Sequence, residues 1–238
     1  MKLHLLGTSG PFPESHGATS GYLLEAGNSL FQFDLGSGVL GTLTALTAPE
    51  SLTALFLSHW HFDHAADVPV LMYRLAALGK QLPVYGPADP SSPLYKIVTS
   101  ESCFAFTEVT PGRTFSLGGA DVLITLARHP VPAVGFRISC EGKIFGYTGD
   151  TNTLPSLSDD FRNCNLLLAD GLFPRECWTE TKPHLSAELA ARLAAEAGVR
   201  NLLITHLNPL YPRRTLLEDA RPFFPVVQLA ETGMVIDI

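Results

Sequence analysis

Four side chains that can bind a metal ion lie within residues 59 to 64, in the segment FLSHWHFDHAAD. They are His59, His61, Asp63 and His64. Imidazole nitrogens and carboxylate oxygens are the usual ligands of zinc, manganese and iron. In an extended turn, His59 and His61 point to a common side, and Asp63 and His64 follow a few ångströms further along. We therefore prefer a segment that serves two adjacent metal positions to the alternative of four solvated loop residues.

Three further residues of this kind stand where apolar runs end. His129 follows DVLITLAR, Asp150 follows KIFGYTG, and His206 follows NLLIT. Strand ends that converge on one edge of a sheet form the ligand-binding edge of open α/β proteins. We therefore expect these three side chains to join the first four. His184, in KPHLSAE, precedes a helical pattern instead, and an exposed loop position is the alternative for it.

The composition is that of a globular chain with a sizeable core. Of the 238 residues, 46% are hydrophobic and only 16% are charged, which is far from the signature of disorder. We expect a single domain that spans residues 1–238. The formal net charge of -7 disfavours the broad basic surface on which nucleic-acid binders depend. A small-molecule substrate is therefore favoured over a long nucleic acid.

The cysteines and the N-terminus point to the cytoplasm. The four cysteines form neither a CxxC pair nor a dense disulfide pattern, so we expect them to be reduced. The first residues, MKLHLLGTSG, lack the apolar region and the cleavage site of a secretion signal. No later apolar run reaches the length of a membrane span. We therefore expect a cytoplasmic protein with no membrane partner.

Apolar patterns predict the elements that position the candidate ligands. Ten short β-rich runs are expected to be strands: KLHLLG, GYLLEAG, SLFQFD, TALFLS, DVLITLA, GFRISCEG, KIFGYTG, NLLLAD, RNLLITH and GMVIDI. The clearest helix lies in SAELAARLAAEAG, where apolar residues share one face. Weaker helical patterns cover residues 67–78, residues around 93–104, and residues 215–223. These elements predict an α/β fold of mixed sheets with helices outside them.

The motifs together resemble the metallo-β-lactamase superfamily, and most closely its branch of ribonuclease Z and related phosphodiesterases. The His-x-His-x-Asp-His element at residues 59–64 is typical of the superfamily. The other matching signals are LGTSGPFP, FDLGSG, HPVPAVGFRI, GYTGDT, HLSAE and THLNP, and the likeness runs from residue 3 to residue 209. The resemblance implies a four-layer αβ/βα sandwich with a dinuclear metal site between its two sheets.

The resemblance also assigns the seven candidate ligands to two divalent metal ions. The first ion would be held by His59, His61 and His129. The second ion would be held by Asp63, His64 and His206. Asp150 would bridge the two ions, and Asp34, after an early strand, would steady the metal loop. Zn²⁺ is the expected metal, with Mn²⁺ and iron as alternatives that the same ligands suit.

His184 matches a histidine that lies beside the metals in the ribonuclease Z branch and assists the leaving group. That branch pairs it with a glutamate in a HEA element, whereas this chain offers Asp170 in LLADGLF. The shorter carboxylate can still orient an imidazole. We therefore name His184, Asp170 and the metal-binding Asp63 as candidate catalytic residues. The backbone of residues 8–10 is expected to cradle an anionic group, with an ordinary tight turn as the alternative.

The chemistry expected of this set is hydrolysis. Two metal ions about 3.5–4 Å apart can activate a bridging water and neutralise charge on a phosphoryl oxygen. A histidine can then protonate the leaving alkoxide. The leading hypothesis is a dinuclear metal-dependent phosphodiesterase that acts on a small or cyclic phosphodiester or a short nucleotide.

Three alternatives stay open. A ribonuclease Z-like endoribonuclease is disfavoured because residues 65–128 carry no long basic excursion like the arm with which ribonuclease Z handles tRNA. A hydrolase of carboxylic esters, lactones or thioesters would use the same ligands on carbon. A non-catalytic metal-binding sensor would keep the metals without turnover. Dimers are common in the families that the chain resembles, so a homodimer is compatible with all of these functions.

Overall fold

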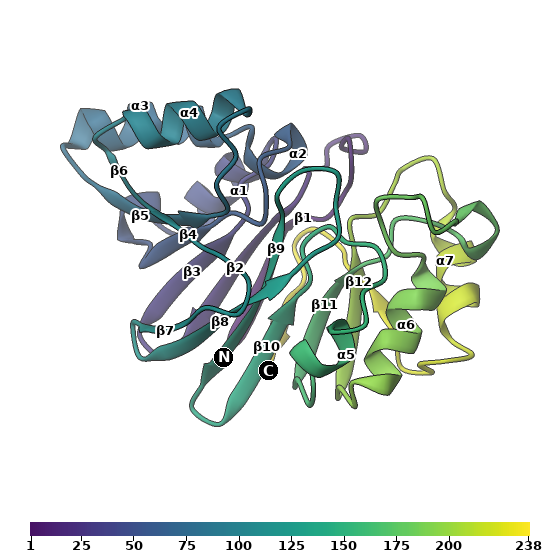
Figure 1. Cartoon of the computed structure of the whole chain (residues 1–238). Helices are drawn as coiled ribbons and strands as arrows, with labels where there is room; N and C mark the ends of the chain where they lie inside the picture. Colours follow the sequence, from purple (N-terminus) through teal and green to yellow (C-terminus); the bar gives the residue numbers. More distant parts are fainter.

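The computed structural model describes all residues from 1 to 238 as two seven-stranded sheets, packed face to face, with helices outside them (Figure 1). The strand order is β14-β1-β2-β3-β4-β5-β6 in the first sheet and β13-β12-β11-β10-β9-β8-β7 in the second. The α/β class and the four-layer sandwich that the sequence predicts are confirmed.

The first sheet comes mainly from the N-terminal half of the chain. Its strands are β1 (Lys2–Gly7), β2 (Gly21–Ala26), β3 (Ser29–Phe33), β4 (Ala54–Phe56), β5 (Leu82–Gly86), β6 (Phe104–Glu108) and β14 (Val235–Asp237). The helices on this side are α1 (Val39–Leu46), η1 (Pro49–Ser51), α2 (Phe62–Ala65), α3 (Val68–Leu78) and α4 (Pro93–Ser100). Strands β1 to β3 are antiparallel, whereas β3 to β6 are parallel, so β3 to β6 all end at the same edge.

The second sheet repeats this arrangement in the C-terminal half. Its strands are β7 (Thr114–Leu117), β8 (Ala120–Leu126), β9 (Val134–Cys140), β10 (Lys143–Tyr147), β11 (Leu166–Asp170), β12 (Asn201–Thr205) and β13 (Gln228–Leu229). Its helices are α5 (Leu157–Asp160), η2 (Arg175–Cys177), α6 (Ala187–Glu196) and α7 (Arg213–Ala220). Strands β7 to β10 are antiparallel and β10 to β13 are parallel.

Every predicted strand and helix is present, and the differences lie in added elements and in boundaries. The structure adds β5, β6, β7, β13 and the helices α1, α2 and α5. The helix expected around residues 93–104 ends at Ser100, because Phe104 already begins β6. The helix expected at residues 215–223 starts earlier, at Arg213, and ends at Ala220.

Aromatic side chains fill the space between the two sheets. Phe33 and Phe56 of the first sheet meet Phe136 of the second, with ring centroids 5.5 and 5.3 Å away, and Phe33 also meets Phe145 at 5.6 Å. All four rings are fully buried. Burying one side chain of this size stabilises a fold by about 1.5–3 kcal/mol. This core fixes the distance between the sheets, and hence between the residues that follow their strands.

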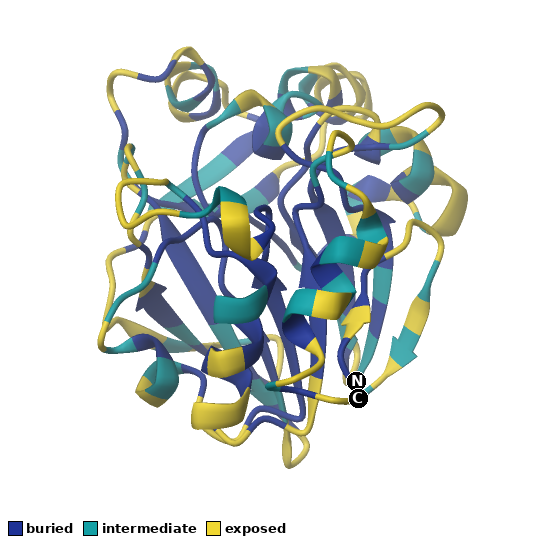
Figure 2. Cartoon of the chain, turned by 90° about the vertical axis from the view of Figure 1, so that its right-hand side faces the viewer, coloured by how far each residue is buried: buried dark blue, intermediate teal, exposed yellow.

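The outer layers show one buried and one exposed face. Figure 2 shows the central strands largely buried, while the helices present exposed residues to solvent and buried residues to the sheets. None of the helices combines the length and the apolar character needed to cross a membrane. All four cysteines carry free thiols.

Candidate metal centre

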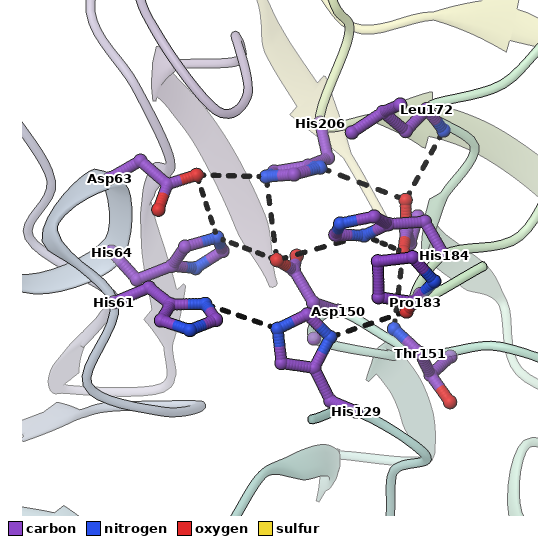
Figure 3. A network of polar contacts seen from close by, with 12 residues as sticks. His61, Asp63, His64, His129, Asp150, Thr151, Leu172, Pro183, His184 and His206 are labelled. Carbon is purple, nitrogen blue, oxygen red and sulfur yellow. Dashed lines mark hydrogen bonds and ion pairs between the residues drawn. The ribbon is translucent and has the colours of Figure 1, made fainter. Parts of the chain in front are cut away.

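All seven predicted metal ligands lie together at the edge of the sandwich where the strands of both sheets end. Figure 3 shows His61, Asp63, His64, His129, Asp150 and His206 of this cluster from close by. The loop after β4 and helix α2 supply four of the seven. The segments that follow β8, β10 and β12 supply the other three: His129, Asp150 and His206. Because parallel strands of both sheets end at this edge, residues more than 140 positions apart in the sequence become neighbours, as His206 and Asp63 do.

The first group of ligands consists of three histidines whose nitrogens face one another. The Nε2 atoms of His59 and His129 lie 2.9 and 3.1 Å from the Nδ1 atom of His61. Burial lowers the pKa of all three imidazoles, and that of His129 falls to about 4. A neutral imidazole carries a nitrogen lone pair, which is the form that binds a metal. Three such nitrogens around one point fit a shared cation.

The second group consists of Asp63, His64, Asp150 and His206. The Nε2 atom of His206 lies 3.1 Å from Oδ2 of Asp63 and 3.4 Å from Oδ2 of Asp150. The same oxygen of Asp150 lies 3.2 Å from Nε2 of His64 and 3.6 Å from Nε2 of His59, which belongs to the first group. One carboxylate oxygen therefore faces both groups, as a bridging ligand must.

Asp34 holds His64 in place from behind. Its Oδ2 atom accepts hydrogen bonds from Nδ1 of His64 at 2.7 Å and from the Tyr147 hydroxyl at 2.6 Å. The backbone N–H and the hydroxyl of Ser58 donate to the same carboxylate at 2.7 and 2.8 Å. With its Nδ1 atom occupied, His64 directs Nε2 toward Asp150. Asp34 thus takes the supporting position that the resemblance implied.

The backbone is strained at two residues of this site. Asp34 and His206 have φ angles of 53° and 58°, in the left-handed region that side chains other than glycine rarely adopt. Strain of this kind is concentrated at functional sites. The His206 ring is also packed against the chain, because a Cβ atom on Gly10 would lie only 2.0 Å from its Nε2 atom. The surrounding fold therefore holds His206 in one orientation.

His184 and Asp170 form a pair beside the second group. The Nδ1 atom of His184 donates to Oδ2 of Asp170 at 2.9 Å, and the His184 ring stacks on that of His206 with centroids 4.8 Å apart. Two backbone N–H groups also donate to Asp170, at 3.1 and 3.2 Å. Burial alone would lower the pKa of His184, but the carboxylates of Asp170 and Asp150 outweigh it and raise that pKa to about 9. Asp170 therefore orients His184 despite being shorter than a glutamate.

A family model described as a beta-lactamase superfamily domain matches residues 9–207. The chain belongs to this superfamily. One relative is the probable metallo-hydrolase YhfI of Bacillus subtilis, which is 30% identical in sequence over 99% of each chain. The crystal structure of that metallo-beta-lactamase fold protein superposes with a TM-score of 0.93 and covers 99% of this chain and 98% of its own.

Ribonuclease Z enzymes are also similar to this chain in sequence. Ribonuclease Z of Methanosarcina acetivorans is 26% identical, with 100% of this chain and 98% of the relative covered. The crystal structure of the short form of human tRNase Z has the same fold, with a TM-score of 0.83 at 19% identity and coverage of 100% and 99% of the two chains. Membership of the superfamily, together with the histidine–aspartate cluster, supports a hydrolase that binds divalent metal ions.

The donor atoms fit divalent metal ions in both groups. Within each group the candidate ligand atoms lie within 4.8 Å of one another. A further set that meets this limit consists of Asp150, Asp170, His184 and His206. Asp170 is ill suited to bind a metal there, because its oxygens already accept from His184 and from two backbone N–H groups. The two groups of candidate ligands therefore could each hold a divalent metal ion, with Asp170 outside both groups.

The tight turn after β1 does not form the expected anion cradle. The N–H groups of Thr8 and Ser9 both donate to the Ala18 oxygen at 3.2 Å, and that of Gly10 donates to the Leu207 oxygen at 3.2 Å. All three donors are therefore used within the fold. The expectation of an anion site here is wrong, and the alternative of an ordinary structural turn is correct.

Apart from Asp34, the residues that support the candidate ligands were not predicted from the sequence. Ser58, Tyr147 and the backbone oxygen of Pro183, which accepts from Nδ1 of His129 at 3.2 Å, were given no role. The only available signal was position, because Ser58 precedes the first ligand and Tyr147 lies three residues before Asp150. Neither residue type by itself indicates a metal centre.

Proposed function

We propose that this chain is a dinuclear metal-dependent phosphodiesterase that hydrolyses a small or cyclic phosphodiester or a short nucleotide. The observation that carries this proposal is the position of His184, which Asp170 holds at 2.9 Å beside the carboxylate that faces both ligand groups. Zn²⁺ is the proposed metal, and Mn²⁺ and iron suit the same ligands. The net charge of -7 supports a small substrate rather than a folded RNA.

The chain's own residues contribute binding, orientation and a proton. Bound divalent metal ions would supply Lewis-acid polarisation of a phosphoryl oxygen and a lower pKa for the attacking water. The carboxylates of Asp170 and Asp150 raise the pKa of His184 to about 9, which favours the form of the ring with a proton on both nitrogens. Nδ1–H is engaged by Asp170, so Nε2–H is the proton available to a leaving alkoxide. Such general acid catalysis contributes about 10²- to 10⁴-fold in rate.

The first test varies the leaving group, using protein reconstituted with zinc or manganese. Bis(p-nitrophenyl) phosphate releases a weakly basic phenolate that needs no proton, whereas a 2′,3′-cyclic nucleotide releases an alkoxide that does. We expect Asp150→Ala to abolish cleavage of both substrates and to lower the metal content. We expect His184→Gln to slow the cyclic substrate by about 10²- to 10⁴-fold and the phenyl diester by less than about tenfold, with metal content unchanged.

A matched control is His4→Gln, which removes a histidine of β1 that pairs with Glu25 of β2, outside the metal centre. It should leave both rates unchanged. Equal losses on both substrates in His184→Gln would contradict the role as proton donor. Cleavage of p-nitrophenyl acetate alone would reject phosphoryl chemistry in favour of a carboxylic ester, lactone or thioester hydrolase. Two bound metals without any turnover would favour a metal-binding sensor.

A further inference from the structure

A cavity of about 480 Å³ adjoins the first group of ligands. His129 lines it, so the cavity and the candidate metal centre share a residue. The other walls come from the segments that follow β5, β6 and β8 and from the loop that leads into β9. These segments lie at the same edge of the sandwich as the ligands, and the volume is within the usual range for small-molecule sites. The cavity is therefore an extension of the metal centre toward β5 and β6.

Eleven of the fourteen residues that line this cavity are aliphatic or proline, and none is lysine or arginine. Its aliphatic side chains include Val109, Leu126, Ala127 and Val131, and four prolines line it as well. Its polar residues are Thr110, Glu108 and His129. Glu108 is the only residue with a formal charge at neutral pH, and it is exposed. An anionic group would therefore find no counter-charge here and would meet a carboxylate. An uncharged apolar group would lose its contact with water, which is favourable.

Hydrogen bonds tie the walls of the cavity to the metal loop. The indole N–H of Trp60, between two candidate ligands, donates to the backbone oxygen of Pro87 at 2.7 Å. The backbone N–H of Val134 donates to the oxygen of Ser58 at 2.9 Å. The prolines restrict the backbone further, because each one fixes its own φ angle. The pocket is therefore preformed, and a ligand group does not have to order it on binding.

We propose that this proline-lined pocket binds an uncharged apolar or aromatic group of the substrate while its anionic group lies at the metal centre. That the anionic group is a phosphodiester rests on the proposed function. With that function, the pocket restricts the substrates to diesters that carry an apolar ester group next to the scissile phosphate. A diester that carries a second anion at this position is excluded from the class.

Binding without turnover tests the pocket independently of catalysis. Phosphonates serve because their P–C bond is not hydrolysed, and we would compare methylphosphonate with benzylphosphonate and 2-phenylethylphosphonate by calorimetry on the zinc-reconstituted protein. We expect the better of the aromatic ligands to bind at least about tenfold more tightly than methylphosphonate. Filling the pocket with Val131→Trp should abolish this preference and leave the Kd of methylphosphonate unchanged.

Two further variants make the test decisive. Leu126→Trp provides a second way to fill the pocket if Val131→Trp does not fold. The Leu126 side chain is 45% exposed, so a larger residue there should be tolerated by the fold. Val226→Trp adds the same bulk to an exposed valine outside the pocket and should keep the preference. The proposal is overturned if the unsubstituted protein binds methylphosphonate and the aromatic phosphonates with equal affinity, or if it binds no phosphonate. It is also overturned if the variants with a filled pocket still prefer the aromatic phosphonates.

The outcomes also separate the pocket from the proposed function. If the protein prefers aromatic phosphonates but hydrolyses no phosphodiester, the pocket is supported and the proposed phosphodiesterase function is rejected. If it hydrolyses phosphodiesters but shows no preference for aromatic phosphonates, the proposed function is supported and the pocket is rejected.

Discussion

Asp34 and Asp150 are both buried carboxylates, yet their surroundings prepare them for different roles. Asp34 accepts hydrogen bonds from His64, from Tyr147 and twice from Ser58, so its oxygens are fully used by protein donors. Asp150 has candidate ligand histidines around its Oδ2 atom instead. Burial opposes its ionisation, but the neighbouring histidines hold the pKa of Asp150 well below its ordinary value. Asp150 is therefore the carboxylate that is free to bind a metal ion.

The same contrast explains which site residues could be predicted from the sequence. Few residue types bind metals, so the spacing of His59, His61, Asp63 and His64 carried a strong signal. The supporting residues are of types with many other uses. Tyr147 reaches Asp34 across the two sheets, over 113 positions of sequence, and no local pattern reports such a contact. The ligands were thus predictable, and among their supports only Asp34 was indicated, through the resemblance, whereas Ser58 and Tyr147 were not.

At Gly10 we expect an alanine to disturb the metal centre. The added Cβ atom would lie 2.0 Å from Nε2 and 2.4 Å from Cε1 of His206, so the ring would have to move away from Asp63 and Asp150. We expect Gly10→Ala to lower the metal bound per chain, measured by elemental analysis after removal of free metal. Activity should fall in the same proportion.

The control for Gly10→Ala is Gly41→Ala in helix α1, where nothing lies within 4 Å of the added Cβ atom. This change should raise stability by about 0.5–1 kcal/mol, because alanine is the better helix former, and should leave the metal content unchanged. A full metal complement in Gly10→Ala would show that His206 does not need its observed position.

Among the elements, the predictable ones have strong local patterns. The strands β11 and β12 are apolar and almost entirely buried, and both were expected. The missed strands β6 and β7 are edge strands of their sheets and are partly exposed, so their alternation is weak. Helix α1 was missed because VLGTLTAL contains a glycine and threonines, and it starts without a side-chain cap. Packing on the sheet, rather than local preference, forms these elements.

Helix α6 couples stability to the site through Ser186, the residue that caps its N-terminus. The Ser186 hydroxyl accepts from the N–H of Leu189 at 3.2 Å, and Ser186 follows His184 by two positions. Removing this cap in Ser186→Ala should cost about 1 kcal/mol and lower Tm by about 2–4 °C. Because the segment that carries His184 enters the helix here, cleavage of a diester with an alkoxide leaving group should slow as well.

Helix α4 provides the matched control, because the Ser92 hydroxyl caps it by accepting from the N–H groups of Leu94 and Tyr95. Ser92→Ala should lower Tm by a similar amount, measured by calorimetry, without changing turnover. If both variants lose stability and both keep full activity, the cap of α6 is a structural feature only.

Across the whole molecule, each group of candidate ligands combines residues from both halves of the chain. The first group joins His59 and His61 of the N-terminal half to His129, and the second joins Asp63 and His64 to residues after β10 and β12. The two halves are otherwise held together by the aromatic core between their sheets. Bound metal ions would therefore link the two sheets at the edge that carries the candidate ligands, which lies outside the aromatic core.

Chelation of the metal ions should accordingly destabilise the whole fold. A ligand that binds only the folded state at about a hundred times its Kd adds about 2.7 kcal/mol to stability. For a chain of this length that amounts to a loss of about 5–10 °C in Tm when EDTA removes the metal, measured by differential scanning calorimetry. EDTA saturated with zinc beforehand should have no effect. In His61→Ala/His206→Ala, which lacks a ligand in each group, EDTA should change Tm little. The same large shift in that variant would mean that the stabilising ions bind elsewhere.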